Sequence, residues 1–193
     1  MFQIIANRLA TGVRRVSALA HARALLRRED GAAALEFAVV SAPFLALLFA
    51  IMETALMFFA SQTLETAVQS SGRLVLTGQA QNQGMSQSSF QTAVCQTLSS
   101  LFSCGSILID VETASTFSSA NTSLPIQNGQ VQNNFSFSPG GPGDIVVVRL
   151  MYQWPVYVSL FGLSNTLSNT SGSSNLLMAT AAFRNEPYQA PSP

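Results

Sequence analysis

A single apolar segment near the N-terminus constrains this chain more than any other feature. Residues 31–60 read GAAALEFAVVSAPFLALLFAIMETALMFFA, and Glu36 is the one charged residue between Asp30 and Glu53. The 22 residues between those two acids would span about 33 Å as a helix, and the hydrocarbon core of a bilayer is about 30 Å thick. The sequence therefore predicts one membrane-spanning helix. A buried core helix is the alternative, although such helices are seldom apolar on every face.

The charged residues are few and unevenly placed. The 193 residues include nine Arg and no Lys, nine acidic residues and one His, so the formal net charge is zero. Six of the nine Arg precede Gly31. Cytoplasmic flanks of membrane helices carry the excess of Arg and Lys. The positive-inside rule therefore predicts that residues 1–30 are cytoplasmic and that the chain lies outside after about residue 60.

The same composition excludes several functions. Charged residues make up 9% of the chain, so it has no broad basic face for nucleic acid. Without Lys there is no P-loop, and His21 is the one histidine, so no Ser–His triad is expected in the rest of the chain. We predict that the chain is not an enzyme and has no catalytic residue, metal site or cofactor. Asp110 and Glu112 share one face of a predicted strand, and without a cleft we interpret them as a solvated face.

Two residues inside the apolar segment, Pro43 and Glu36, are unusual in an apolar helix. Pro43 removes a helix hydrogen bond and is expected to kink the helix, which membrane helices tolerate. A carboxylate inside a membrane helix is costly and usually has a partner. Glu36 therefore indicates either a nearby cation or a side chain that reaches back to the cytoplasmic headgroups. An ordinary secretory signal peptide fits poorly, because the apolar run exceeds the usual 7–15 residues.

The residues around Gly31 resemble the cleavage site of a prepilin peptidase. Arg28-Glu29-Asp30-Gly31 is followed by Ala32-Ala33-Ala34-Leu35-Glu36-Phe37. In type IV pilin-like proteins the peptidase cuts after the Gly, and the mature chain carries Glu at its fifth position. The resemblance implies a leader over residues 1–31 and a mature chain that begins at Ala32, with Glu36 fifth and the aromatic Phe37 after it.

More specifically, the chain resembles the TadE-like proteins of the tight-adherence (Flp) pilus system. Their N-terminal signature adds an Arg-rich, acidic context, a Pro inside the apolar run, as at Pro43, and a second acidic residue, as at Glu53. The resemblance also covers residues 144–188. It implies a pilin-like α+β fold and a minor pseudopilin of the inner membrane, which acts in the assembly or initiation of type IVb-like pili.

The resemblance also implies partners. These are the prepilin peptidase, related Tad pseudopilins, the inner-membrane pilus platform and membrane lipid, with the major pilin as a further candidate. Cleavage would leave an α-ammonium group on Ala32, one helical turn from Glu36, so this carboxylate could meet its own or a neighbour's amine. The alternative is an uncleaved signal-anchored envelope protein with an outer binding or adhesin domain. A TadF- or TadG-like relative is a second alternative that shares the cleavage.

Beyond the membrane the patterns predict a small α+β domain. Apolar residues at helical spacing extend the first helix, so we expect a transmembrane and extended helix over residues 32–76 and a periplasmic domain over residues 77–193. Gly78 and the polar residues 79–84 are predicted to end the first helix. A second helix is predicted at residues 86–102. Strands predicted from alternation are 106–116, 144–154, 176–184 and, more weakly, 131–137. They should form an antiparallel sheet packed on the outer half of the first helix.

Three further features of the sequence carry predictions. Cys95 and Cys104 are the only cysteines, and outside the cytoplasm an even pair predicts a disulfide, with two free thiols as the alternative. Residues 154–163, WPVYVSLFGL, are apolar and aromatic. They predict either core packing or a patch that binds a partner or the membrane surface. Residues 186–188 are expected to form a tail laid on the domain.

Overall fold

The computed structural model describes residues 31–98, 101–157, 168–171 and 174–188. Two compact units divide the chain, residues 1–49 and residues 50–193. The described part of the first unit is helical. Helix α2 (Ala32–Leu76) begins directly after Gly31, contains Pro43 and continues into the second unit. It occupies the range that hydropathy and apolar spacing predicted for it.

The helix is long and apolar enough to cross a membrane. Its most apolar stretch has no buried residue, and in the first unit its large apolar side chains are exposed. These are Leu35, Phe37, Val39, Val40, Phe44, Leu45, Leu47, Leu48 and Phe49. An apolar surface of this extent is what a membrane-spanning helix presents to lipid.

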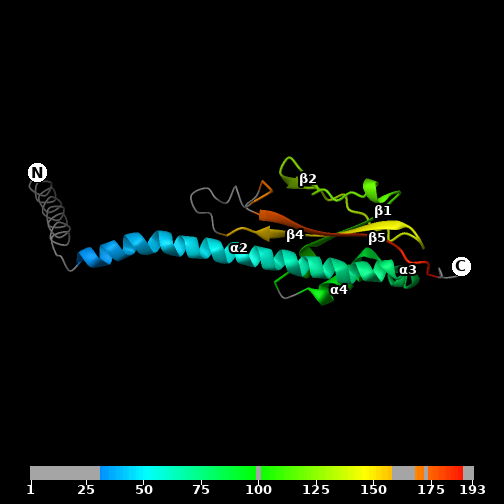
Figure 1. Cartoon of the computed structure of the whole chain (residues 1–193), viewed down its shortest axis with the longest axis horizontal. Helices are drawn as coiled ribbons and strands as arrows, with labels where there is room; N and C mark the ends of the chain where they lie inside the picture. Colours follow the sequence, from blue (N-terminus) through cyan, green and yellow to red (C-terminus); the bar gives the residue numbers. More distant parts are fainter. Residues whose placement is uncertain (1–30, 99–100, 158–167, 172–173, 189–193) are drawn as a thin grey trace, which may run out of the picture. The chain divides into compact units, whose positions relative to one another are not determined.

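The second unit is built on a three-stranded antiparallel sheet. Its order is β1 (Ile107–Ala114), β4 (Ile145–Pro155) and β5 (Ser174–Arg184), so the central strand is β4. In this register Asp110 lies opposite Arg149. The strands run beside the C-terminal part of α2 (Figure 1). The α+β fold expected from the sequence, a long apolar helix followed by a small antiparallel sheet, is therefore confirmed.

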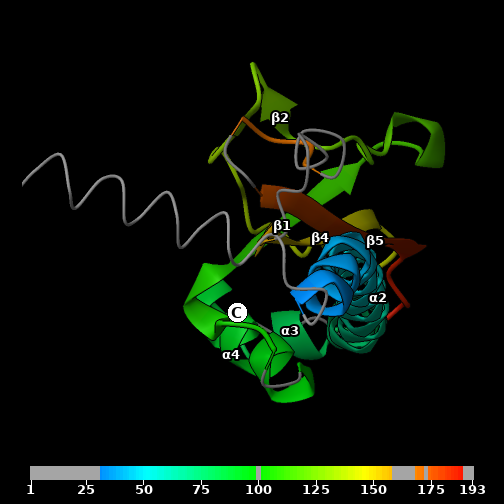
Figure 2. The same cartoon turned by 90° about the vertical axis from the view of Figure 1, so that its left-hand side faces the viewer.

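One face of the sheet packs on helices. Figure 2 shows α2 and α4 (Gln87–Thr97) on the same side of the strands. The stripe of α2 that faces the sheet is closely packed, with Ala60, Leu64, Ala67 and Val68 fully buried. Alternate residues of β4, Val146, Val148 and Leu150, are buried in the same core, as period-two alternation predicts. Phe90 of α4 meets Phe137 with ring centroids 5.3 Å apart.

The other face of the sheet is covered as well, which the alternation did not predict. The connection from β1 to β4 holds a 3₁₀ turn, η3 (Phe117–Ser119), and a small hairpin of β2 (Ile126–Gln127) and β3 (Gln130–Val131). Figure 2 shows this hairpin on the side of the sheet away from α2. Val147, Met151 and Leu176 are buried on this side.

Two local predictions were wrong in detail. Residues 131–137 do not form a fourth strand of the sheet; Phe137 makes one parallel bridge to Val111. The second helix ends at Thr97 instead of 102, because Leu98 is already extended. The predicted end of the first helix is confirmed, because α2 ends at Leu76; a short separate helix, α3 (Gln79–Asn82), follows the left-handed residue Gly78.

The C-terminal segment lies against the end of α2, as the sequence suggested. The Glu186 N–H donates to the Leu76 carbonyl at 2.9 Å, and the Asn185 amide donates to the carbonyls of Pro139 and Gly141. The ring of Tyr188 covers Gly78, where a Cβ would lie 2.3 Å from the Tyr188 Cγ. Gly78 has a φ of +75°, so both its conformation and its surroundings require glycine.

Candidate functional site: the N-terminal helix and its attachment to the sheet

The predicted cleavage point coincides with the start of a helix. Gly31 precedes α2, and Ala32 is the first residue of that helix. Glu36 and Phe37 are in the helix and exposed, with 74% of the Phe37 side chain accessible. Ala32 and Glu36 are four residues apart and therefore lie on the same helix face. The preceding Arg28-Glu29-Asp30 lies outside the described residues.

The start of α2 is suited to the chemistry that cleavage would create. The first four N–H groups of a helix have no partner within it, and that end carries a partial positive charge. The first turn contains no acidic residue, so Glu36 is the nearest carboxylate along this helix. An α-ammonium group on Ala32 would lie within one turn of it. The helix therefore places the predicted Ala32 amine and the Glu36 carboxylate on the same face.

Pro43 lies inside α2, and both it and its neighbours Ala42 and Phe44 are exposed. Its nitrogen has no hydrogen to donate, so the Val39 carbonyl loses its usual helical partner. The nearby Ser41 hydroxyl donates to the Ala38 carbonyl at 3.3 Å. A freed carbonyl in the apolar part of a helix needs another donor, which a neighbouring helix can supply in a membrane.

Glu53 ties α2 to the end of the sheet, and sequence reasoning missed this role. Its side chain is buried, at 7% exposure, and the Tyr157 N–H donates to its Oε1 at 2.5 Å. Tyr157 follows the last residue of β4 by two positions. The signal available in the sequence was a lone acid interrupting an apolar run, which marks a carboxylate with a partner. The partner is 104 residues away and could not be identified from spacing.

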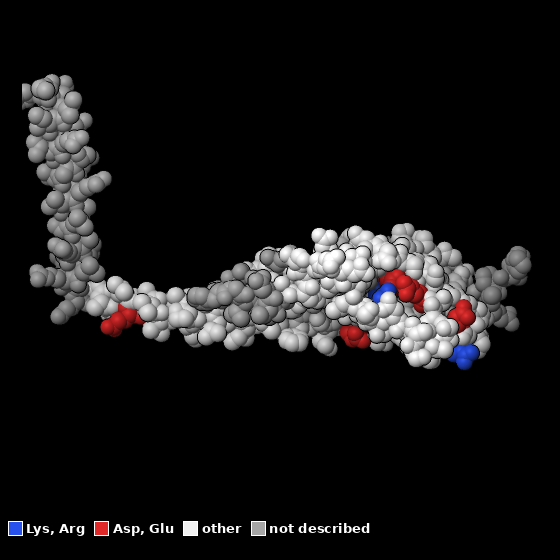
Figure 3. All heavy atoms as spheres, turned by 90° about the horizontal axis from the view of Figure 1, so that it is seen from above, with Lys and Arg blue, Asp and Glu red and all other residues white. Residues whose placement is uncertain are grey.

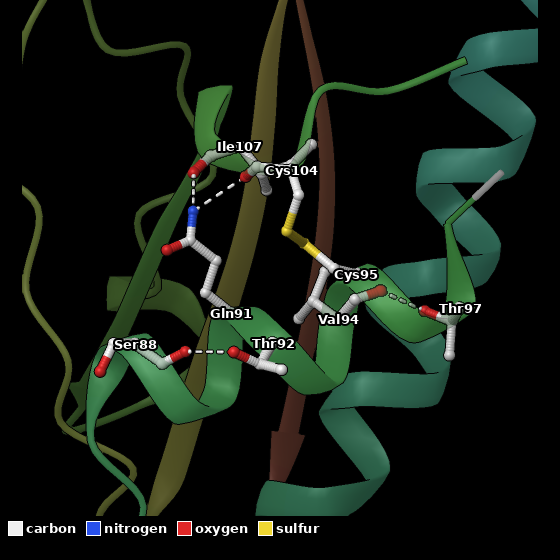
Figure 4. The surroundings of a disulfide bond; sticks show 8 residues. All are labelled: Ser88, Gln91, Thr92, Val94, Cys95, Thr97, Cys104 and Ile107. Carbon is white, nitrogen blue, oxygen red and sulfur yellow. Dashed lines mark hydrogen bonds between the residues drawn. A yellow bond between two sulfur atoms is a disulfide. The ribbon is translucent and has the colours of Figure 1, made fainter. Parts of the chain in front are cut away.

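The disulfide predicted between Cys95 and Cys104 is present, with their Cα atoms 5.8 Å apart. It joins the end of α4 to the 3₁₀ turn η2 (Cys104–Ser106), which leads into β1. Figure 4 shows that the Gln91 side chain reinforces this junction. Its amide donates to the Cys104 carbonyl at 3.0 Å and to the Ile107 carbonyl at 3.1 Å. Two independent links therefore hold α4 against the start of β1.

The acid that was interpreted as part of a solvated strand face is buried, so that interpretation was wrong for Asp110. Asp110 is fully buried and accepts hydrogen bonds from the Nε and Nη2 of Arg149. Its other oxygen accepts the Ser136 N–H at 2.8 Å. Glu112 remains partly exposed, 3.6 Å from the same guanidinium. The pair therefore fastens the β1–β4 connection to the sheet.

The described surface is otherwise poor in charge. On the face shown in Figure 3, most of it belongs to uncharged residues. One titratable group outside the helix is perturbed by its surroundings. Burial raises the pKa of the Tyr188 phenol, and the nearby Asp144 carboxylate raises it further.

Residues 31–73 match a family model described as TadE-like protein. Neither the curated proteins nor the solved structures contain a match to the chain. The matched segment begins at Gly31 and includes Glu36, Pro43 and Glu53, the residues on which the resemblance was based. The comparison thus confirms, over residues 31–73, that the chain carries the segment characteristic of the TadE-like family.

Proposed function

We propose that this chain is a minor pseudopilin that acts in the assembly or initiation of tight-adherence (Flp, type IVb-like) pili. The observation that carries the proposal is the TadE-like match beginning at Gly31, together with a helix that begins at Ala32. A prepilin peptidase that cuts after Gly31 would release a mature chain whose first residue is already the first residue of an apolar helix.

The proposed topology is a single-pass inner-membrane protein. The Arg-rich residues 1–31 are cytoplasmic, α2 crosses the bilayer, and the sheet domain lies in the periplasm or outside the cell. The Cys95–Cys104 disulfide supports an oxidising location for that domain, because disulfides persist mainly outside the cytoplasm.

In this proposal the chain is a substrate and a structural subunit, not an enzyme. Its partners are the prepilin peptidase, sister pseudopilins, the inner-membrane platform and, as a further candidate, the major pilin. Glu36 would accept the α-ammonium group of Ala32 from its own or a neighbouring subunit. Such a pair reduces the cost of both charges in the membrane and sets the axial register of packed helices.

The test is the N-terminal sequence of the membrane-extracted protein, from cells with and without the candidate peptidase. We expect a chain beginning Ala32-Ala33-Ala34-Leu35-Glu36 that is replaced by the full-length chain when the peptidase is absent. A Gly31→Leu variant should retain its leader, because a bulky side chain replaces the residue before the cut. Gly84→Leu, a substitution far along the chain, is the matched control for processing.

An intact leader in peptidase-positive cells would overturn the proposal. The better interpretation would then be an uncleaved signal-anchored envelope protein with an outer binding domain. Glu36 would be a carboxylate that reaches the cytoplasmic headgroups.

A further inference from the structure

The apolar surface of α2 continues past Glu53, where the predicted membrane span ends. Four large apolar side chains just before and after Glu53 are exposed to between 52% and 68%: Ile51, Met52, Phe58 and Phe59. At about 100° per residue, Ile51, Phe58 and Phe59 lie on the side of the helix away from Glu53, with Met52 at the edge of that side. The next exposed residues on that side are polar, namely Gln62, Thr66 and Gln69. The exposed face therefore changes from apolar to polar between Phe59 and Gln62.

Another exposed aromatic residue, Tyr157, lies near the level of Glu53 on the other side of the helix. Tyr157 is bonded through its N–H to the Glu53 carboxylate at 2.5 Å, and its side chain is 80% exposed. Near it the end of β4 is packed by aromatic rings: the ring centroids of Trp154 and Tyr152 lie 6.2 Å and 5.0 Å from that of Phe102. Exposed apolar and aromatic groups thus flank the molecule on both sides of α2 at the level of Glu53.

The length of the apolar surface indicates what covers it. From Ala32, a hydrocarbon core about 30 Å thick takes about 20 residues and ends near Met52. A bilayer that includes both headgroup regions is about 40–45 Å thick, so each headgroup layer adds about 5–8 Å to the core. The backbone of Phe59 is seven residues, or about 10 Å, beyond Met52. Because side chains on a helix point toward its N-terminus, the Phe59 ring lies closer to the core than its backbone, at the outer edge of that headgroup layer.

The distribution around the helix favours lipid over a partner helix. One neighbouring helix would cover either Phe58 and Phe59 or Tyr157, because these residues are on opposite sides of α2. A bilayer surrounds the whole molecule at one depth and covers both. Tyrosine and other aromatic rings also prefer the headgroup level, where an apolar ring and a polar group are both accommodated.

We propose that the outer headgroup layer of a phospholipid bilayer surrounds this molecule as far as Phe59, and that the Tyr157 end of the sheet is seated within it. The proposal depends on the proposed function only in requiring that α2 spans a membrane. The buried Glu53 fits this depth, because the Tyr157 N–H and the surrounding protein replace water around a carboxylate at the edge of the lipid.

The test measures the depth of single tryptophans in the full-length protein in phosphatidylcholine liposomes. Trp154 is the one native tryptophan, so Phe59→Trp, Tyr157→Trp and Thr66→Trp are each made in a Trp154→Phe background. Thr66 is two helical turns beyond Phe59 on the same face, and all three positions are exposed. The probe is phosphatidylcholine with a nitroxide on its headgroup, compared with iodide as a water-soluble quencher.

We expect the nitroxide lipid to remove most of the emission of Phe59→Trp and Tyr157→Trp and little of that of Thr66→Trp. Iodide should give the reverse order. If iodide quenches Phe59→Trp and Tyr157→Trp as strongly as Thr66→Trp, the apolar surface faces water and the proposal fails. It also fails if neither quencher reaches Phe59→Trp and its emission shifts when the protein is diluted in lipid. That result would assign the surface to a protein partner.

Two features keep the test decisive. Trp154 belongs to an aromatic cluster, and Trp154→Phe could disturb it. The same three substitutions are therefore also made with Trp154 retained. In that set, the difference in quenching from the unsubstituted protein reports the added tryptophan. The liposomes contain no peptidase or pilus protein. A failure of depth placement therefore leaves the pseudopilin proposal standing, and a failure of N-terminal processing leaves the depth result standing.

Discussion

Asp110 and Arg149 face each other across the β1–β4 pair, and their side chains form an ion pair that is almost completely buried. The guanidinium donates through Nε at 2.9 Å and through Nη2, and its Nη1 donates to the Ser123 carbonyl at 3.3 Å. Asp110 also accepts the Ser136 N–H. The pair thus joins the connecting segment to the sheet at Ser123 and at Ser136, on either side of the β2–β3 hairpin and on the face opposite α2.

Removing one member of this pair should be costly. Asp110→Ala leaves the Arg149 guanidinium buried without its carboxylate, and loss of one partner of a buried pair typically costs about 3–5 kcal/mol. Glu112→Ala is the control, because Glu112 is partly exposed and 3.6 Å from the same group. It should cost less than about 1 kcal/mol. Urea unfolding of the detergent-solubilised protein measures both. Equal effects of the two substitutions would contradict a buried, structural pair.

A comparison of two glycines separates the contribution of Tyr188 packing from that of backbone strain. Gly78 and Gly84 both have positive φ, at +75° and +56°, but a Cβ at Gly78 would meet Tyr188 whereas a Cβ at Gly84 would meet nothing within 4 Å. Gly84→Ala should cost about 1 kcal/mol from backbone strain alone. Gly78→Ala should cost clearly more and should expose residues 185–188 to added protease. Similar stability of the two variants would show that Tyr188 does not press on Gly78.

Tyr188 should make the domain sensitive to alkali. Its phenol is neutral in the folded and unfolded chain at neutral pH, so it contributes no pH dependence there. Above the ordinary pKa of about 10 the unfolded chain ionises first, because burial and Asp144 hold the folded pKa higher. Stability should therefore fall as the pH rises above about 10, and the fall should be smaller in Tyr188→Phe. Thermal unfolding from pH 8 to 11 follows this difference; parallel curves would exclude it.

The disulfide should stabilise the junction between α4 and β1. Closing a loop of about ten residues contributes about 2.5–3 kcal/mol in the chain-entropy model. The double variant Cys95→Ser/Cys104→Ser should lose an amount of this order in denaturant, and reduction of the unsubstituted protein should have the same effect. Gln91→Ala, which removes the amide linking Cys104 and Ile107, should cost about 1–2 kcal/mol. A double variant as stable as the parent would contradict the prediction.

Glu36 should affect assembly more than processing. In the proposed mature chain its carboxylate meets the Ala32 amine, so Glu36→Ala should leave cleavage after Gly31 largely intact and impair co-purification with sister pseudopilins. Glu65→Ala removes an exposed acid on the same helix, beyond the proposed membrane span, and should change neither. Unchanged co-assembly of Glu36→Ala would remove the proposed role of this residue.

Local patterns were sufficient for the elements that depend on sequence neighbours. The end of α2 at Leu76 follows from apolar residues at helical spacing and from Gly78, which adopts a left-handed conformation that ends the helix. The core-facing residues of β4 follow from alternation. The disulfide followed from two cysteines in a chain expected to be exported. Each of these is decided by interactions of a few residues or by composition.

The second covered face of the sheet could not be predicted in the same way. Arg149 and Asp110 alternate with apolar residues on their strands, and in an isolated strand that pattern indicates a side open to water. Only the long β1–β4 connection, folded back over the sheet, removes water from both side chains. Residues 131–137 were also predicted as a strand from their local pattern. Only Phe137 bridges to β1, and its ring packs on Phe90 of α4, which the local pattern does not specify.

The sequence by itself determined a helix long and apolar enough to span a membrane, the Gly31–Glu36 spacing and the TadE-like character of the N-terminal segment. These properties are encoded by hydropathy and by residues close together in the chain. The tertiary structure alone decided that Glu53 is held by Tyr157, that Asp110 is buried with Arg149, and that Tyr188 covers Gly78. Each of those pairs joins residues far apart in the chain. Their burial depends on how complete elements pack, which no local pattern specifies.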